Sequence, residues 1–306
     1  MTRSSIAILI GLIFISFFTY RIYADHSGST IFSNLDESRP SHSTLQLSSH
    51  NELTNTPPFC KDTGVNEDLN LPSSNSPTTD WQLVWQDEFN TDCLNPIKWN
   101  VEDWAAEKNN ELQYYKPDNV QVENNVLRLT SKKELYQGRD FTSGAVHTRN
   151  TFDLLYGKIE MRAKLPAGQG VFPAFWMMAD KENTWLPEID IMEMLGHKPN
   201  EVWMVNHSLD GNGELTSESY AFKGADFSKE FHTFSVEWSF DSVRWLIDDV
   251  ERFKTTKNVP QERMYLYLNT AIGGDWPGFP DSTTEFPVHY DIDYVRVYER
   301  VSTSSR

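Results

Sequence analysis

Apolar and polar residues alternate along most of the chain after about residue 81. The runs VQVENNVLRLTS (residues 120–131), FHTFSVEW (231–238) and MYLYLNTAI (264–272) change character at nearly every position and are rich in β-branched and aromatic residues. Successive side chains of a β-strand point to opposite faces of its sheet, so this alternation predicts short strands that each bury one face.

Turn sequences separate these runs, among them NN at residues 124–125, DGNG at 210–213 and GG at 273–274. No long segment of the sequence has a helical period, and no internal repeat is present. Short strands with frequent turns favour a two-sheet antiparallel sandwich over a βαβ fold. The sequence therefore predicts one all-β domain over residues 80–300, followed by a disordered tail at 301–306.

The first residues of the chain have a different character. Residues 6–20 (IAILIGLIFISFFTY) form an uncharged apolar run. The run is short for a membrane-spanning helix, which needs about 20 residues, and it suits the apolar region of a signal peptide. A buried core helix is disfavoured, because nothing before the run can cover it. Residues 1–24 are predicted to be a signal peptide cleaved after Ala24, or an uncleaved signal anchor, since Arg21 directly follows the run. Either outcome predicts a secreted, periplasmic or otherwise extracellular location.

Residues 25–79 are rich in Ser, Thr, Asn and Pro and poor in aromatic residues. Such a composition buries too little apolar surface to offset the entropy lost on ordering, which predicts a disordered linker. The linker contains Cys60, one of two cysteines in the chain. In an oxidising compartment Cys60 could bridge to Cys93, and two free thiols are the alternative.

The charge of the chain excludes some classes of partner. With 44 acidic and 27 basic residues the formal net charge is −17. Nucleic acids require a basic surface, and anionic lipid requires basic clusters, so neither is an expected partner. Contact with a membrane is expected only through the N-terminal apolar run if it stays uncleaved, and the protein is expected to act as a monomer.

The sharpest chemical signal is PEIDIMEM at residues 187–194. Glu188 and Asp190 are two residues apart, so in a strand both project from the same face. Glu193 lies at an odd offset from Glu188 and would face the core, where an unpaired carboxylate is very costly. A β-bulge at about Ile191-Met192 adds one residue and returns Glu193 to the face of the other two acids.

Three neighbouring carboxylates repel one another, which raises the pKa of at least one of them. Hydrolysis of a glycosidic bond uses that asymmetry, because one carboxylate must be ionised while another keeps its proton. A solvated acidic strand face and a calcium site are alternatives. Tryptophans near polar residues favour sugar chemistry, since an aromatic ring covers the flat face of a sugar. They are Trp104, Trp176, Trp185 and Trp276, and each alone could be a core residue.

Seven segments together resemble glycoside hydrolase family 16. In chain order they are WQDEF (85–89), NNELQYY (109–115), YGKIEMRAKLPAGQGVFPAFWM (156–177), EIDIMEMLGH (188–197), FHTFSVEW (231–238), LNTAIGGDWPG (268–278) and IDYVRVYE (292–299). The resemblance runs from about Trp81 to Glu299. It implies a β-jelly-roll sandwich of the concanavalin A-like kind, with a concave sugar groove, and retaining hydrolysis of β-glycans through a covalent glycosyl-enzyme.

The resemblance also implies roles for single residues. Glu188 would be the nucleophile, Asp190 its assisting acid and Glu193 the general acid/base. Two residues rather than one separate Asp190 from Glu193. This spacing is similar to that of the laminarinase branch, which acts on β-1,3-glucans. The sugar-contacting positions are Asn110, Trp176, Trp185 and His207, to which we add Arg149, Trp104 and Trp276. Asn110 could instead be a turn residue, His207 a core histidine and Arg149 a partner of a surface acid. Many relatives carry tryptophan where this chain has Phe172.

Family members often bind a structural calcium ion on the convex side, and the matching positions are Glu88 and Asp293. An ordinary surface acid is the alternative at each position, and the reaction itself requires no cofactor. The expected function is an exported endo-β-1,3-glucanase that hydrolyses internal bonds of laminarin-type glucans. The alternatives are a transglycosylase or β-1,3-1,4-glucanase on the same scaffold, and a non-catalytic glucan-binding protein.

Overall fold

The computed structural model describes residues 59–60, 80–182 and 184–301. The predicted signal segment 1–24, nearly all of the predicted linker and residues 302–306 of the predicted tail lie outside these residues. The described residues belong to one compact unit, Leu53–Arg306. None of the helical structure described there is long and apolar enough to cross a bilayer.

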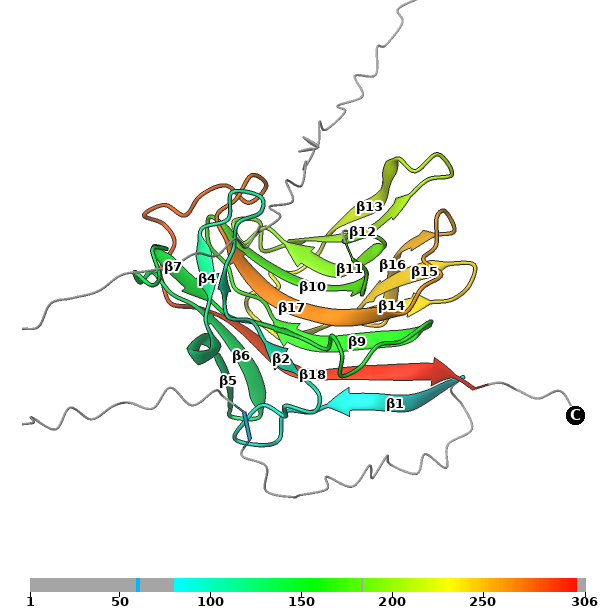
Figure 1. Cartoon of the computed structure of the whole chain (residues 1–306), viewed down its shortest axis with the longest axis horizontal. Helices are drawn as coiled ribbons and strands as arrows, with labels where there is room; N and C mark the ends of the chain where they lie inside the picture. The colour runs from blue at the N-terminus through cyan, green and yellow to red at the C-terminus, as the bar shows by residue number, and fades with distance from the viewer. Residues whose placement is uncertain (1–58, 61–79, 183, 302–306) are drawn as a thin grey trace, which may run out of the picture. The chain divides into compact units, whose positions relative to one another are not determined.

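In the part of the chain that the structure describes, two large antiparallel sheets are stacked face to face (Figure 1). The seven-stranded sheet has the order β13-β12-β11-β10-β17-β8-β2. Its strands are β2 (Asn100–Val101), β8 (Ala145–His147), β10 (Val171–Ala179), β11 (Glu188–Met194), β12 (Glu201–Leu209), β13 (Leu215–Lys223) and β17 (Met264–Ile272).

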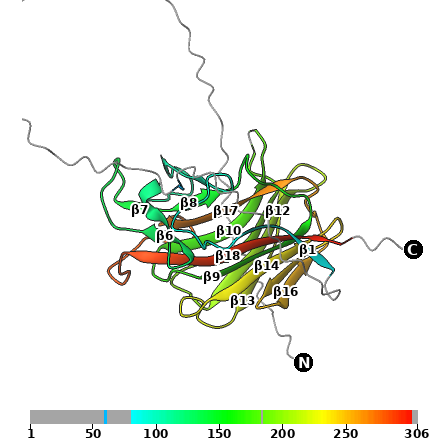
Figure 2. The same ribbon diagram turned by 90° about the horizontal axis from the view of Figure 1, so that it is seen from below.

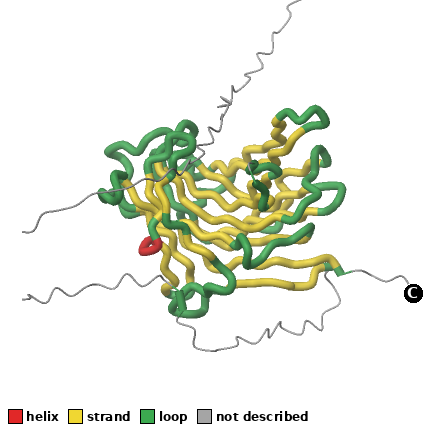
Figure 3. The backbone as a smooth tube through the Cα atoms, in the orientation of Figure 1, coloured by secondary structure: helices red, strands yellow, loops and turns green. Residues whose placement is uncertain are grey.

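The eight-stranded sheet, visible from below in Figure 2, has the order β16-β15-β14-β9-β18-β6-β5, with β1 also paired to β18. Its strands are β1 (Trp81–Asp87), β5 (Val120–Glu123), β6 (Val126–Ser131), β9 (Gly157–Lys164), β14 (His232–Trp238), β15 (Val243–Ile247), β16 (Val250–Thr255) and β18 (Val288–Arg300). A small third sheet contains β3 (Trp104–Ala105), β4 (Gln113–Tyr115) and β7 (Phe141–Ser143). The short 3-10 helix η1 (Pro117–Asn119) is the only helix among the described residues, as Figure 3 shows.

The main core lies between the two sheets, because each strand turns its apolar positions inward. On β17, Met264, Leu266 and Leu268 are fully buried in this core. Tyr265 and Tyr267 alternate with them and belong to a separate cluster on the other face of the same sheet. The period-two pattern of the sequence thus corresponds to the two faces of the strands, and the predicted two-sheet all-β sandwich is confirmed.

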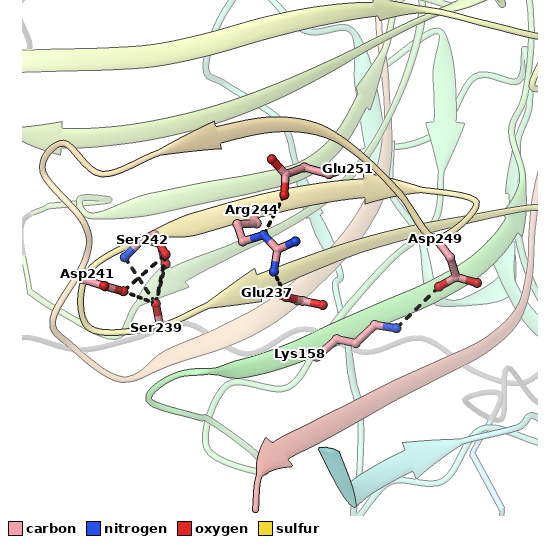
Figure 4. Close-up of polar contacts among 8 residues, drawn as sticks. All are labelled: Lys158, Glu237, Ser239, Asp241, Ser242, Arg244, Asp249 and Glu251. Atoms are coloured by element: carbon pink, nitrogen blue, oxygen red, sulfur yellow. Dashed lines mark hydrogen bonds and ion pairs between the residues drawn. The ribbon is translucent and has the colours of Figure 1, made fainter. Parts of the chain in front are cut away.

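The outer face of the eight-stranded sheet is covered by ion pairs and polar side chains. Arg244 on β15 donates hydrogen bonds of 2.7 Å to Glu237 on β14 and to Glu251 on β16 (Figure 4). Lys158 on β9 lies 3.6 Å from the carboxylate of Asp249, in the turn after β15. Exposed pairs of this kind add little to stability, so this face serves mainly to keep one side of the sheet solvated.

A disulfide joins Cys60 to Cys93. The backbone supports it, because the Cys60 N–H donates to the Leu94 carbonyl at 3.0 Å and Phe59 forms a β-bridge with Leu94. Of the two states left open by the sequence, the bridged one is therefore present. The bond ties Phe59 and Cys60 to the sandwich.

Replacing Cys60 and Cys93 with serine should lower the free energy of unfolding. The bridge spans a sequence separation of 33 residues. A loop of that size restricts the unfolded chain by about 3–4 kcal/mol in the chain-entropy account. The double variant should unfold at a lower midpoint concentration of urea than the native protein. Reducing agent should lower the midpoint of the native protein only. Equal midpoints for the two proteins would contradict the contribution of the bridge.

Candidate active site

Strand β11 places the three candidate acids on one face by means of a β-bulge. Toward β12, Asp190 is opposite Val205 and Glu193 is opposite Trp203, so two residues of β11 face a single residue of its neighbour. Toward β10 the register also shifts beside Asp190. The extra residue restores the alternation beyond it, which confirms the predicted bulge at Ile191-Met192.

The opposite face of β11 belongs to the main core. Ile189, Ile191, Met192 and Met194 are all buried there, including the two consecutive residues at the bulge. Asp190 is itself only 3% exposed, whereas Glu188 and Glu193 are partly exposed. Because β11 turns its apolar side chains into the core between the sheets, its three carboxylates face away from the eight-stranded sheet.

Neighbouring strands place rings beside these acids. His207 on β12 is opposite Glu188, and Trp176 on β10 is opposite Asp190. The His207 Nε2 atom lies 3.5 Å from Asp190 Oδ2. Trp185, in the loop before β11, contacts the His207 ring edge-on with centroids 5.4 Å apart. These predicted residues therefore form one contiguous group around the first two acids.

A hydrogen-bonded chain orients Trp176. Its indole N–H donates to Asn269 Oδ1 at 2.9 Å, and the Asn269 amide donates to the Tyr115 hydroxyl at 2.9 Å. The Trp176 ring also packs on Tyr267, with centroids 4.8 Å apart. Sequence reasoning missed Tyr267 and Asn269. The signal was present, because the alternation in MYLYLNT puts Tyr265, Tyr267 and Asn269 on one face.

Burial raises the pKa of all three carboxyl groups. For Glu188 burial is the largest cause, followed by the charges of Asp190 and Glu193, and Lys108 acts in the opposite direction. For Glu193 burial is again the first cause, with Asp190 second. Burial raises the pKa of Asp190 to about 7, against a hydrogen bond with Glu188 that lowers it. The cluster therefore titrates as a unit and holds protons well above the usual range of a carboxyl group.

His207 adds no positive charge to the cluster. Burial lowers the pKa of its imidazole to about 4, so the ring is neutral above that pH. Its Nδ1 atom lies 2.6 Å from the hydroxyl of Ser217 on β13, which fixes the orientation of the ring. A neutral, oriented imidazole beside Asp190 suits a hydrogen-bonding role.

The other candidate aromatic residues are accessible. Trp104, Trp185 and Trp276 have exposed fractions of 38%, 37% and 44%, so none of them is a core residue. Trp276 contacts Phe172 and Trp203 edge-on, with centroids 5.2 and 5.6 Å apart, and Trp203 is opposite Glu193. Trp276 is thereby connected to the end of the acid row that carries Glu193.

Two polar candidates lie in loops. Asn110 donates to Asp275 Oδ1 at 2.7 Å, which joins its loop to that of the adjacent Trp276. Asn110 has a φ of +57°, a turn conformation, so it is both a turn residue and a neighbour of Trp276. Arg149 follows β8 and forms an ion pair with Asp180. Arg149 therefore has the surface-acid partner that the sequence left as its alternative.

The two positions proposed for calcium are taken by arginine. Glu88 receives two hydrogen bonds from Arg296, at 2.7 and 2.8 Å, and Asp293 is paired with Arg162. A guanidinium beside each carboxylate repels a cation, and both oxygens of Glu88 already accept hydrogen bonds, so this donor set does not fit calcium.

Two family models match the chain. The model of glycosyl hydrolases family 16 matches residues 107–296. The model named beta-glucan synthesis-associated protein SKN1/KRE6/Sbg1 matches residues 1–183. The first match contains all three acids of β11, and the second ends before them.

Curated proteins and solved structures agree with the first of these matches. A beta-glucanase of Rhodothermus marinus is 34% identical over 253 residues, which are 72% of this chain and 86% of that protein. Glucan endo-1,3-beta-glucosidase A1 of Niallia circulans is 32% identical over 285 residues, or 78% of this chain, but the match spans only 41% of that longer protein.

The laminarinase catalytic domain of Thermotoga maritima is 39% identical and superposes with a TM-score of 0.67, covering 72% of this chain and 99% of that one. The shared architecture is the β-jelly-roll sandwich. With the bulged acid strand inside the matched segment, the chain belongs to glycosyl hydrolases family 16, in its laminarinase-like branch.

Proposed function

We propose that this glycoside hydrolase is a retaining endo-β-1,3-glucanase that cleaves internal bonds of laminarin-type glucans. The observation that carries the proposal is the bulge in β11, which brings Glu188, Asp190 and Glu193 to one face. The names of the relatives, which include beta-glucanase, endo-1,3-beta-glucosidase and laminarinase, support the same linkage.

In the first step the Glu188 carboxylate attacks the anomeric carbon while Glu193 gives its proton to the glycosidic oxygen. The bond from the anomeric carbon to that oxygen breaks, and the leaving glucan departs with the proton. Burial and the charge of Asp190 keep the pKa of Glu193 high, so that this group can still hold the proton it must donate. The product of the step is a glycosyl ester of Glu188.

In the second step Glu193, now ionised, removes a proton from water. The water oxygen attacks the anomeric carbon, and Glu188 leaves as a carboxylate. Asp190 lies between the two and is hydrogen-bonded to Glu188. We assign it the role of stabilising Glu188 as its charge appears and disappears. Two displacements at one carbon retain its configuration.

The residues around the acids are suited to hold a β-glucan. Trp176, Trp185, Trp104 and Trp276 provide rings for sugar faces, and the neutral His207 offers a hydrogen bond without adding charge. Asn110 lies next to Trp276 through Asp275. Arg149, exposed beside Asp180, is the proposed donor to sugar hydroxyls. These are proposed contacts of a single protein chain acting as a monomer.

We infer that the enzyme acts outside the cytoplasm. The Cys60–Cys93 disulfide is suited to an oxidising compartment, where such bonds persist. The apolar run at residues 6–20 supplies a signal peptide or an anchor for export. Both features support a secreted or membrane-anchored hydrolase with its substrate in the extracellular space.

A transglycosylase is the second candidate, and the match of residues 1–183 to a beta-glucan synthesis-associated family favours it. The glycosyl-enzyme would be the same, but a sugar hydroxyl rather than water would accept the glycosyl group. Incubation with laminarin and a labelled oligosaccharide acceptor separates the two. Longer labelled chains at low substrate concentration indicate transfer, and only shorter unlabelled products indicate hydrolysis.

Glu188→Gln should abolish turnover while the fold and glucan affinity remain. Without the nucleophile, release of reducing ends from laminarin should fall by about 10⁴-fold or more. Glu237→Gln is the matched control, because Glu237 lies on the outer face of the other sheet, paired with Arg244. The substrates are laminarin, lichenan, agarose and xyloglucan. If the native enzyme releases reducing ends from none of them, a non-catalytic binding protein becomes the better account.

Glu193→Ala should be rescued by azide on a laminaribioside with an activated leaving group. Such a substrate forms the glycosyl-enzyme without proton donation, and the small anion then attacks it in place of activated water. The expected product is the β-glycosyl azide, detected by mass spectrometry and by its anomeric proton signal. A correctly folded variant that azide does not accelerate would argue against the acid/base role.

Asp190→Asn should stabilise the protein at pH 8 but have little effect near pH 4. Burial raises the folded-state pKa of Asp190 to about 7, above its ordinary value of 3.8, so the native state binds the proton more tightly than the unfolded state. Stability from this group is therefore present below about pH 4 and is lost as the pH rises through 7. Each kcal/mol regained by the neutral amide corresponds to about 2–4 °C in melting temperature. Thermal melts at intervals from pH 4 to pH 8 measure the difference, and a variant less stable at pH 8 would show that the pKa is not raised.

A further inference from the structure

The bulge in β11 is contacted from the opposite sheet. The indole N–H of Trp245, on β15, donates to the backbone carbonyl of Asp190 at 2.8 Å. Trp245 is fully buried in the core between the sheets. A bulge locally disrupts the ladder of its strand, and a buried carbonyl without a partner costs about 1–3 kcal/mol. The Asp190 carbonyl, which adjoins the bulge, thus takes a hydrogen bond from outside its own sheet.

Trp245 is itself held in one place. Its ring stacks on Phe253 of β16, with centroids 4.9 Å apart and an angle of 28°. The register of β15 and β16 shifts directly after this pair, because Leu246 is opposite Glu251 and leaves Arg252 as an extra residue. Bulges change the direction in which neighbouring side chains point. The hydrogen bond therefore joins irregularities in two facing sheets.

The contact acts on the one residue that links the acids. Asp190 precedes the extra residue of β11, and its side chain lies between Glu188 and Glu193 along the strand. A shift of the Asp190 carbonyl moves its own side chain and changes the step to Glu193. Catalytic groups lose about 100-fold in rate for a misplacement near 1 Å.

We propose that Trp245 is a positioning residue of the active site. Its indole N–H holds the Asp190 carbonyl across the core and so fixes the bulge and the spacing of Glu188 and Glu193. The inference rests on the proposed function, since it takes these acids to be the catalytic groups. This role differs from packing in one respect. It depends on the N–H group of Trp245 and not on the volume of its ring.

The chain offers a matched control in Trp238. This residue, on the adjacent strand β14, is also fully buried, and its indole N–H donates to the Pro260 carbonyl at 3.0 Å. It is thus a second core tryptophan with the same kind of hydrogen bond, made to a loop instead of to β11. Trp238→Phe loses the same kind of indole hydrogen bond as Trp245→Phe, but that bond is made to Pro260 and not to the acid strand.

The test compares Trp245→Phe and Trp238→Phe in the full chain. Both should lower the melting temperature, but only Trp245→Phe should reduce kcat on laminarin oligosaccharides, by about 10- to 100-fold. KM should stay within about twofold, because the sugar-contacting side chains are unchanged. A looser bulge lets water reach Glu193, so the alkaline limb of the kcat profile should move to lower pH. Equal loss of kcat in both variants, or an unchanged kcat in Trp245→Phe, overturns the proposal.

A second variant covers the case in which Trp245→Phe fails to fold. Benzothienylalanine at position 245 keeps the shape of the ring and replaces the N–H with sulfur. It should reproduce the loss of kcat, and a native kcat in this variant overturns the proposal. Hydrogen exchange of the β11 amides should rise in both position-245 variants and not in Trp238→Phe. This readout needs no turnover, so if the native enzyme is inactive on glucans the proposed function fails while the exchange still tests the contact.

Discussion

Loss of hydration at three adjacent carboxylates is the constraint on which the rest of the site depends. Glu188, Asp190 and Glu193 cannot all be ionised at low cost, since each loses hydration, and Glu188 and Glu193 also face the charge of neighbouring acids. The surroundings limit that cost without removing it. Lys108 offsets part of the charge on Glu188, whereas the neutral His207 adds no compensating charge. The cluster therefore keeps protons available at the pH where a hydrolase needs both an acid and a nucleophile.

Packing and hydrogen bonds around β11 hold the three carboxylates together despite this cost. One side of β11 is fixed by core residues, and the other is bordered by Trp176, whose indole is held by Asn269 and in turn by Tyr115. The eight-stranded sheet contributes more than a cover for the core, because it supplies the Trp245 contact to the bulge. Stability lost at the acids is offset by packing and hydrogen bonds elsewhere, as is common at functional sites.

The sequence predicted the features that depend on local pattern. Alternation predicted the strands, and the cost of a buried carboxylate at Glu193 was enough to predict the bulge, because both arguments involve neighbours along one strand. Tyr267 and Asn269 were also within reach of the same reasoning, since they share a face of β17.

Other features were beyond a single sequence, because they join distant residues. Trp245 and Asp190 meet only through the stacking of two sheets. The pairing of Glu88 with Arg296 depends on the register of β1 and β18, so the expected calcium positions carry arginine partners that the motif could not reveal. Cysteine pairing had to stay open for the same reason.

Trapping the glycosyl-enzyme tests the central claim most directly. A 2-deoxy-2-fluoro laminaribiosyl fluoride slows both steps through its ring fluorine, while its good leaving group keeps the first step accessible, so a retaining enzyme accumulates the ester. Peptide mass spectrometry should find one laminaribiosyl group on Glu188, within the β11 segment. A label on Glu193, or steady turnover of the reagent with no label on the protein, would contradict the assignment of the acids.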